Sequence, residues 1–558
     1  MGYVKIRKDS IECDILVVGG GIAGLMAAIR GTEMGAKVVV AEKADTRRSG
    51  SGATGNDHFL CYIPEYHGND IESIVHEVTD SLYGKWQDVS ILRVMMRRSF
   101  DVVKMWDSYG ISMRPHGEWE FNGHAMPGRP LINLKYDGRN QKPILTKEAL
   151  KRGVKIINKM LIAELLTDGD GCVVGAIGVN IKEREPEIAT FKAKAVILTA
   201  GNASRLYPGI SPAYLFNVAH SPGNTGSGQA MAFRAGARLV NLDIPYSHAG
   251  TKYFARCGKA TWIGVLKDYY SEPVGPFVTK PSKEFGDVTA DIWTSVFKEK
   301  MANGTGPTFM DCSETAEEDL QYMFWGLQCE GDTSVIDYMD KYNIDIRKHM
   351  IEFTQYEPML IGRGIEIDHR GAASIPGLYA AGDLVGNFRS DISGAAVWGV
   401  ISAEHASQYV KNVDCTDVEG HKLILEKADF YSEMLSRSYG SNWHEANAAL
   451  QQIMRDYAGN EVRSETLLCS GLKYLQDLRK YATEQVKAAN SHELMRALEV
   501  FDLMDVGELI MMCARERKET RENHKRSDYT FTNPLLNNMF QTIEKTEDGV
   551  ITEFRKRI

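Results

Sequence analysis

The sequence predicts an α/β protein in which a Rossmann-type dinucleotide-binding domain is interrupted by an α+β capping domain and followed by a helical C-terminal domain. Three observations lead to this prediction. A strand, a glycine turn, a helix and a second strand follow one another at residues 13–43. Two strand-like runs that close in glycine turns lie far downstream, at 194–201 and 377–383. Leu, Met and Ala recur at helical spacing from 444 to 516.

The first unit carries a dinucleotide-binding fingerprint. Residues 14–18 form a short apolar run, and Gly19, Gly21 and Gly24 follow it at GxGxxG spacing, opening a helix expected over residues 22–34. The first glycine permits a tight turn, the second lets the backbone approach a pyrophosphate, and the third packs the helix against the strand. We expect the pyrophosphate to lie on the N–H groups at the start of this helix, where Ala23 also lies.

The second strand of the unit, residues 38–41, ends in an acid. Glu42 is placed to accept hydrogen bonds from the adenosine ribose, and Lys43 follows it. Glycine-rich turns alone are common, but strand, glycines, helix, strand and acid in this order are specific. The unit therefore predicts an adenine dinucleotide site.

The two later strand-like runs indicate which dinucleotide binds. KAVILTAG at 194–201 ends in Ala200 and Gly201, and GLYAAGD at 377–383 ends in Gly382 and Asp383. The order of the three segments resembles FAD-binding flavoproteins and not NAD dehydrogenases. This resemblance implies that Asp383 holds the ribityl or pyrophosphate region of FAD and that the next helix points its N-terminus at the flavin.

Composition excludes several classes of protein. With 558 residues the chain is too long for one compact core, and 43% hydrophobic with 25% charged residues is ordinary for a globular protein. A net charge of -9 and a pI near 5.9 argue against a nucleic-acid partner. Outside the fingerprint there is no run of about 18 apolar residues, so we expect no membrane span and a cytoplasmic location.

The nine cysteines show no CxxC pair and no cluster-binding run. Most are expected to be buried as small apolar residues. If the flavin exchanges electrons with an iron–sulfur cluster, another polypeptide must supply the cluster, and no metal site is predicted in this chain.

Long insertions separate the FAD-binding signals and suggest four segments. We expect the first part of the FAD-binding domain at 1–243, the capping domain at 244–353, the second part of the FAD-binding domain at 354–418, and the helical C-terminal domain at 419–558.

Further motifs carry a more specific resemblance. NTGSG at 224–228, followed by AGA at 235–237, and RKETRENHKRSDY at 517–529 are similar to segments of the flavoprotein subunits of succinate dehydrogenase and fumarate reductase. SHELMRALE at 491–499 and KPI at 142–144 resemble the adenylylsulfate reductase alpha subunit within that superfamily. The resemblance implies an oligomeric FAD-dependent oxidoreductase that acts on a small anionic substrate and exchanges electrons with a ferredoxin-like iron–sulfur subunit.

Two departures from the family pattern matter for the chemistry. NFRSDISG at 387–394 stands where fumarate reductases carry an arginine motif. Gly50, between Ser49 and Ser51, occupies the place of the histidine that attaches FAD covalently in many relatives. We therefore expect FAD to be bound non-covalently, with these three residues beside it.

Five residues are candidates for catalysis. Asn56 aligns with a flavin-proximal asparagine of the resembled branch, although a surface turn is the alternative for residues 56–58. His220 precedes the TGSG segment at 225–228. His248, Lys252 and Arg256 lie where relatives place an anion-binding arginine, at the entry to the capping domain; structural hydrogen bonding is the alternative for the histidines. Arg363 lies between two glycines that permit close approach to flavin or ligand.

Three classes of function remain open at this stage. The first is a catalytic flavoprotein subunit, either with adenylylsulfate-like sulfur chemistry or with fumarate reductase-like reduction of an activated C=C bond. The second is an electron-relay subunit of a larger redox complex, which the missing arginine motif favours. The third is a non-catalytic scaffold stabilised by FAD, which would have no need of a capping domain.

Overall fold

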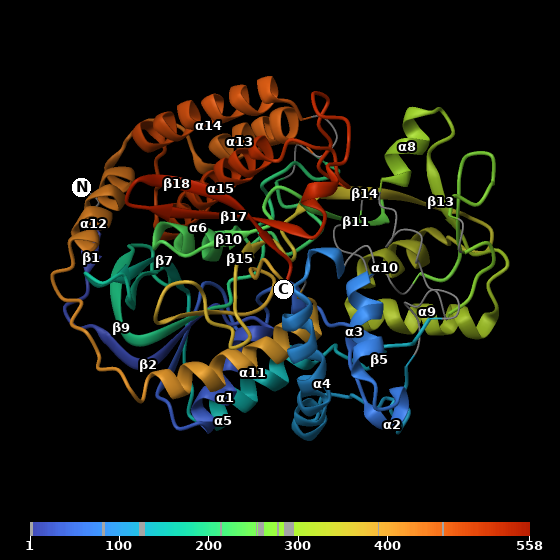
Figure 1. The fold of residues 1–558 in the computed structure, drawn as a ribbon, viewed down its shortest axis with the longest axis horizontal. Coiled ribbons are helices and arrows are strands. Elements are labelled where there is room, and N and C mark those ends of the chain that lie inside the picture. The colour runs from blue at the N-terminus through green and yellow to red at the C-terminus, as the bar shows by residue number, and fades with distance from the viewer. Residues whose placement is uncertain are drawn as a thin grey trace.

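The computed structural model describes residues 4–80, 84–121, 129–211, 215–252, 254, 262–275, 278–283, 295–388, 390–459 and 463–558. In Figure 1 the large sheet lies at the left, the capping region with α8, α9 and α10 at the right, and the helices α13 and α14 along the top. The chain crosses between these regions several times, so segments that are far apart in sequence meet at their junction.

The main sheet has the order β6-β3-β2-β9-β8-β7, with β1 and β16 also paired to β9. Its strands are β1 (Lys5–Ile6), β2 (Ile11–Val18), β3 (Val38–Glu42), β6 (Lys155–Asn158), β7 (Met160–Thr167), β8 (Val173–Asn180), β9 (Glu187–Leu198) and β16 (Leu378–Ala380). The pairs joining β6, β3, β2, β9 and β16 are parallel, whereas β7 and β8 add an antiparallel edge. The last four residues of β2 and of β9 are continuous apolar runs because both faces of the sheet are covered there.

Three helices lie below this sheet in Figure 1: α1 (Ile22–Glu33), α5 (Gln141–Lys151) and α11 (Ile392–Tyr409). A Cβ atom at Gly399 would lie 2.4 Å from the carbonyl oxygen of Ala23, so α11 can approach α1 this closely only with glycine at that position. The first turn of α1 therefore packs directly against the middle of α11. Beside them lie β4 (His58–Leu60), α2 (Pro64–His67), α3 (Ile71–Asp80), α4 (Val89–Tyr109) and β5 (Asn133–Lys135).

The capping region has its own sheet and core. Strands β11 (Tyr246–Thr251), β14 (Ile351–Met359), β13 (Thr308–Asp311) and β12 (Val265–Lys267) form a sheet in that order. Helices α8 (Val296–Ala302), α9 (Glu317–Glu330) and α10 (Thr333–Tyr342) accompany it, and Trp262, Met323 and Phe353 lie in its core. All of β14 belongs to this sheet, so the predicted division after residue 353 would cut through a strand.

The C-terminal region contains helices α12 (Lys422–Ser436), α13 (Trp443–Ala458), α14 (Glu465–Gln485) and α15 (Ser491–Glu516). The sequence predicts a helical domain to residue 558, but the last α-helix of the structure ends at Glu516. Strands β17 (Met539–Thr546) and β18 (Gly549–Lys556) form a hairpin that joins β10 (Leu239–Val240) and β15 (Gly364–Ile365) in a second sheet. Alternating side chains around an Asp-Gly dipeptide at 548–549 are a hairpin signal that the charged composition obscured.

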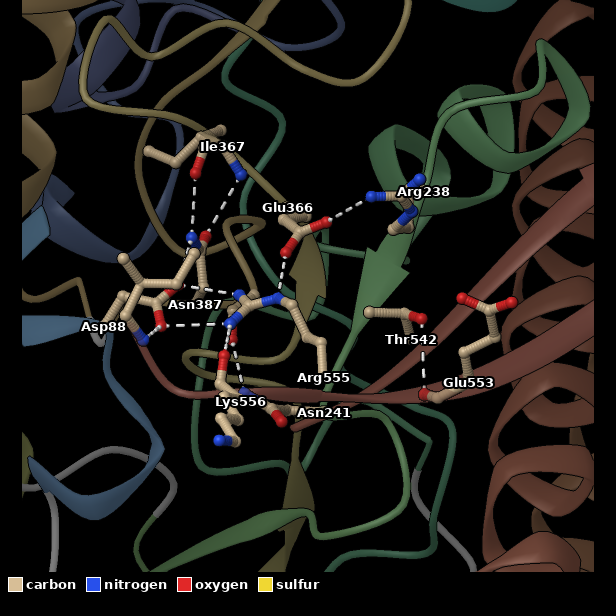
Figure 2. A network of polar contacts seen from close by, with 12 residues as sticks. Asp88, Arg238, Asn241, Glu366, Ile367, Asn387, Thr542, Glu553, Arg555 and Lys556 are labelled. Atoms are coloured by element: carbon tan, nitrogen blue, oxygen red, sulfur yellow. Dashed lines mark hydrogen bonds and ion pairs between the residues drawn. The ribbon is translucent and has the colours of Figure 1, made fainter. Parts of the chain in front are cut away.

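Arg555 anchors this hairpin to the rest of the molecule (Figure 2). Its guanidinium donates to the carboxylate of Asp88 at 2.7 Å and also to Glu366, and Asn387 donates to the same Asp88 carboxylate at 2.9 Å. Asp88 is the residue before α4. The end of the hairpin therefore fixes the start of α4 and the loop after β15. Within the described ranges, no helix has the length and apolar character needed to cross a membrane.

Candidate active site

A cavity of about 640 Å³ lies where the parallel strands of the main sheet end and the capping region begins. Its lining includes the turn after β2, the end of β3, and the turns after β9 and β16. Ligands of open α/β sheets bind at this edge. The predicted cofactor-binding residues that line it are Gly19, Gly21, Ala23, Glu42, Lys43, Ser49, Gly50, Ser51, Ala200, Gly201, Gly382 and Asp383.

The glycine turn has the geometry that the fingerprint predicts. Gly19 has φ +100°, and a Cβ atom there would lie 2.7 Å from the carbonyl oxygen of Thr199. A Cβ atom at Gly24 would lie 1.9 Å from the carbonyl oxygen of Gly19, so Gly24 packs the helix against the turn and does not line the cavity. At Gly21 the nearest atom to such a Cβ is 3.9 Å away, and this backbone is open to a ligand.

Glu42 and Lys43 hold the end of β3 in different ways. The Glu42 carboxylate accepts from the main-chain N–H groups of Gly20 and Ala44, both at 2.6 Å. The Lys43 ammonium donates to Glu499 of α15 at 2.6 Å. Burial opposes ionisation of Glu499, but Lys43 and two arginines outweigh it and lower its pKa to about 2. Lys43 therefore ties the C-terminal region to the edge of the cavity.

Two segments complete the cofactor side of the cavity. Gly50, with φ +81°, lies in the turn before the short 3-10 helix Ser51–Ala53, and Asn224 donates to the Ser51 hydroxyl at 3.0 Å. Asp391 caps α11 by accepting from Gly394 N at 3.0 Å. The N-terminal ends of α1 and α11 both face the cavity, and helix N-termini favour anions. The bare glycine backbone and these helix ends fit an adenine dinucleotide.

The predicted histidines meet at the capping side. His220 and His248 line the cavity, and their rings are stacked with centroids 5.4 Å apart and planes within 11°. His248 lies where the register of β11 against β14 shifts, between Ser247 and Ala249, and such an irregularity turns a side chain out of the regular alternation. The Tyr246 hydroxyl lies 3.3 Å from His248 Nδ1. Two histidines from separate segments thus converge on one wall.

Glu357 fixes the segment that leads to His220. Its carboxylate accepts from the main-chain N–H of Ala219 at 2.6 Å. Burial raises the pKa of Glu357 to about 7. Strand β14 of the capping sheet therefore holds the chain immediately before one of the cavity histidines.

A second polar group lies beside Asn56, which also lines the cavity. Asp57 is fully buried; its carboxylate lies 2.6 Å from His58 Nδ1 and accepts from the Lys135 ammonium at 2.8 Å. The carboxylate of Glu330, the last residue of α9, lies 3.9 Å from His58 Nδ1. The buried position of Asp57 differs from the surface turn weighed as an alternative for residues 56–58.

The Glu330 side chain faces the cavity from the capping region. Burial raises its pKa well above the usual range, and the Asp57 and Asp332 carboxylates add to this shift. Asp57, His58 and Glu330 could together hold a metal ion, since their ligand atoms lie within 4.8 Å of one another. The Lys135 ammonium already balances the Asp57 charge, so the arrangement favours a protonated Glu330 over a bound cation.

The structure places one of the two predicted catalytic arginines outside the cavity. Arg363 does not line the cavity, because its guanidinium donates to the main-chain carbonyls of Ile244 at 2.5 Å and Gly362 at 2.9 Å. It supports the chain at the return from the capping region and does not face a ligand as expected. Arg256 lies outside the described residues.

Several lining residues were not predicted from the sequence, among them Arg48, Glu330, Tyr356 and Asp391. Glu330 had a weak signal, since Gly331 after it marks a helix end, but nothing local distinguishes it from an exposed glutamate. Asp391 could have been found, because an aspartate before an apolar helical run is a typical N-cap.

Comparisons with known proteins agree with this geometry. A family model described as "FAD binding domain" matches residues 14–395, and one described as "Fumarate reductase flavoprotein C-term" matches residues 447–548. Among curated proteins, the chain is similar to one subunit of the fumarate reductase (CoM/CoB) of Methanothermobacter marburgensis, with 24% identity over 95% of this chain and 96% of that protein.

Solved structures show the same fold. The adenylylsulfate reductase of the hyperthermophilic Archaeoglobus fulgidus has a TM-score of 0.86 and 22% identity, over 100% of this chain and 98% of that chain. A variant of the E. coli quinol fumarate reductase FrdA has a TM-score of 0.79 and 18% identity, over 98% and 97%. The predicted fold class is confirmed.

Proposed function

We propose the function of this chain from the premise that it belongs to the FAD-binding domain family, carries the C-terminal region of the fumarate reductase flavoproteins, and is an FAD-dependent oxidoreductase. The proposal is a flavoprotein subunit that reduces or oxidises a small anionic substrate at the junction with the capping region. Similarity to adenylylsulfate reductase and to fumarate reductases supports this class.

The cofactor is assigned to the glycine-lined side of the cavity. The turn at 19–21 and the start of α1 would hold the pyrophosphate, Glu42 the adenosine ribose, and Asp383 with the start of α11 the ribityl and flavin portion. FAD supplies two-electron redox chemistry when it is bound. Gly50 offers no side chain for covalent attachment, so we expect acid precipitation of the protein to release the FAD.

The stacked pair of His220 and His248 is the observation that carries the substrate assignment. These two imidazoles line the cavity together with Tyr356, where strands β11 and β14 of the capping sheet border it. Imidazoles that gain a proton bind an anion, and they also exchange protons near neutral pH. We assign this wall to the anionic group of the substrate.

Glu330 is assigned the proton. It is kept in its acid form by burial and by Asp57, and it lines the same cavity from the opposite element, α9. A carboxylic acid in this position can donate a proton to a substrate that gains electrons, or accept one in the reverse direction. His58 lies beside it, with Nδ1 3.9 Å from the Glu330 carboxylate, and Asn56 lines the same cavity.

The substrate is tested by anaerobic photoreduction of the FAD-loaded protein followed by separate additions. Reoxidation by adenylylsulfate, or bleaching of the oxidised form by sulfite plus AMP, supports sulfur chemistry. Reoxidation by fumarate supports C=C reduction. A His248→Asn variant that keeps its FAD should lose the response about 100-fold, whereas the exposed His349→Asn, which does not line the cavity, should not. Equal responses of the two variants would refute the assignment.

An electron-relay subunit is the second candidate, and the placement of Arg363 favours it. With that guanidinium bound to main-chain carbonyls, Arg363 does not reach the flavin side of the cavity. In this case no small substrate reoxidises the photoreduced protein, but an oxidised ferredoxin does, and a reduced ferredoxin bleaches the oxidised protein. In both cases we propose that the partner is an iron–sulfur subunit, since cysteine spacing in this chain does not match a cluster site.

A further inference from the structure

Lys142 is a buried cation beneath the glycine turn. It is the second residue of α5 and is 1% exposed. Its ammonium donates to the main-chain carbonyl of Gly20, in the middle of the dinucleotide-binding turn. A lysine so deeply buried is normally paired with a carboxylate. Among the described residues, no carboxylate lies within the 4.0 Å of Nζ that defines an ion pair.

The charges around Lys142 are few and distant. Glu42 at the end of β3 and Asp45 after it act on it through space, and both are engaged elsewhere. The Glu42 carboxylate accepts from Gly20 N and Ala44 N, and the Asp45 carboxylate accepts from Arg47. Burial lowers the pKa of Lys142 to about 8. The site thus holds a positive charge that the protein itself does not neutralise locally.

The peptide bond between Gly20 and Gly21 connects this charge to the cavity. In a planar trans peptide the C=O of one residue and the N–H of the next point in opposite directions. The Gly20 carbonyl points back to Lys142, so the Gly21 N–H points away from it, on the side where Gly21 lines the cavity. An ammonium on the oxygen also polarises the peptide and strengthens its N–H as a donor.

We propose that Lys142 is a cofactor-affinity residue that binds the pyrophosphate of the dinucleotide through the Gly20–Gly21 peptide. The carbonyl contact fixes the orientation of the N–H donor, and the ammonium supplies the positive charge that a doubly charged pyrophosphate requires. The lysine itself remains behind the turn and does not touch the ligand.

Gln141, the preceding residue, supports the neighbouring loop without charge. It donates to the carbonyl of Gly52 at 2.8 Å and accepts from the Tyr136 hydroxyl at 2.7 Å. The first turn of α5 therefore supports both loops that line the cofactor side. Gln141 supports its loop by hydrogen bonds alone, whereas Lys142 also brings a positive charge. Removal of that charge therefore tests an electrostatic role beyond the structural one.

The test measures FAD release from the diluted holoprotein by flavin fluorescence, with ADP and adenosine as competitors. Lys142→Met keeps the length of the side chain but removes the charge. We expect the Kd for FAD to rise about 10- to 100-fold, since a hydrogen bond to a charged group contributes about 1.5–3 kcal/mol. The affinity for ADP, which carries a pyrophosphate, should fall by a similar factor, and the affinity for adenosine should not change. The control is Lys147→Met, exposed on the same helix, with an unchanged Kd.

Variation of pH gives a second readout. The ammonium of the free protein loses its proton above about pH 8, so wild-type affinity for FAD should fall between pH 8 and 10. Lys142→Met should show no such fall, and Lys142→Arg should retain both affinity and a flat profile. Adenosine binding weakened as strongly as ADP binding, or parallel pH profiles for wild type and Lys142→Met, would overturn the proposal. If Lys142→Met yields no folded holoprotein, the pH profile of Lys142→Arg is decisive. An FAD affinity that falls between pH 8 and 10 as it does in the wild type would refute the proposal.

Discussion

Two buried polar clusters of similar composition differ in what surrounds them. The anchor cluster joins the C-terminal motif to the chain just before the capping region. The cavity cluster lies where the capping region meets the main sheet. The anchor cluster contains Asp243, Arg463, Arg517, Glu519 and His524. The cavity cluster contains Asp57, His58, Lys135 and Glu330.

In the anchor cluster, the charged groups bind one another, and the one buried oxygen of its described side chains without a hydrogen-bond partner, Asp243 Oδ1, does not line the cavity. Arg517 is fully buried, donating to Asp243 and, at 2.7 Å, to Glu519. His524 Nδ1 accepts from Arg463 at 2.8 Å, and Nε2 donates to the carbonyl of Arg517 at 2.9 Å. Because arginine only donates and a carbonyl only accepts, this histidine is neutral. The cluster is closed and stabilises the fold.

The cavity cluster is open on one side. Glu330 Oε2 is buried and has no hydrogen-bond partner among the described residues, while its side chain lines the cavity. Leaving a polar atom unsatisfied costs stability. Such a group is expected where a ligand or a transferred proton completes the set. Among the described residues, both clusters hold one buried oxygen without a partner, but only that of Glu330 belongs to a side chain that lines the cavity, and access to a ligand therefore distinguishes the two clusters.

The largest effect is expected at the open cluster. Glu330→Gln keeps the shape of the side chain but removes its acidic proton, so turnover should fall by about 10²- to 10⁴-fold. FAD content and the midpoint of urea unfolding should stay near wild type. Glu317→Gln, exposed at the other end of α9, is the matched control and should turn over normally. Steady-state rates with the substrate found by reoxidation give the measurement, and a fully active Glu330→Gln would refute the role.

The next effect concerns the closed cluster and should appear in stability instead of turnover. Arg517→Met leaves Asp243 and Glu519 buried with one cation fewer, which costs about 3–5 kcal/mol. Urea unfolding followed by circular dichroism measures the loss. Arg515→Met, on a partly exposed side chain two residues earlier, should cost less than about 1 kcal/mol. Similar losses in both variants would mean that the anchor cluster is not special.

The same contrast explains what could be predicted from the sequence. The fingerprint at Gly19, Gly21 and Gly24 was recognisable because strand, turn and helix are consecutive. A Cβ atom would clash with neighbouring backbone at Gly19 and Gly24, and Gly21 leaves the backbone open to a ligand. The motif at 517–529 was recognisable by resemblance, and the structure shows that four of its charged or imidazole side chains are buried in hydrogen-bonded positions: Arg517, Glu519, His524 and Arg526. Local pattern therefore predicted the fold class and the cofactor side of the cavity.

The substrate side depends on contacts between distant segments. Glu330 meets Asp57 only because loops at 54–57 and 329–332 pack backbone against backbone, where a Cβ at Gly55 would lie 2.0 Å from the carbonyl of Cys329. No local pattern encodes that contact. Arg363 failed as a candidate for the related reason that main-chain carbonyls, invisible in sequence, bind its guanidinium.

A pH dependence of moderate size should follow from His524. Burial, with the Arg463 guanidinium beside it, lowers the pKa of His524 well below its usual range. The folded state then binds fewer protons than the unfolded state below about pH 6.5, so stability is present above that pH and is lost as pH falls. The loss from this group approaches about 1.4 kcal/mol per pH unit. His524→Gln, whose amide can accept and donate at the same places, should flatten this part of the stability–pH curve.

The smallest effect tests the rim of the closed cluster. Arg521 donates to both oxygens of Glu519, at 2.8 and 2.9 Å, but is more exposed than Arg517. In Arg521→Met the Glu519 carboxylate keeps Arg517 and the N–H of Asn533, so the loss should be about 1 kcal/mol. In the double variant with Arg517→Met, Glu519 loses both guanidinium groups, and the combined loss should exceed the sum of the single losses. If the losses of unfolding free energy in the two single variants simply add up in the double variant, Arg517 and Arg521 do not act together on the Glu519 carboxylate, and the proposed cluster is refuted.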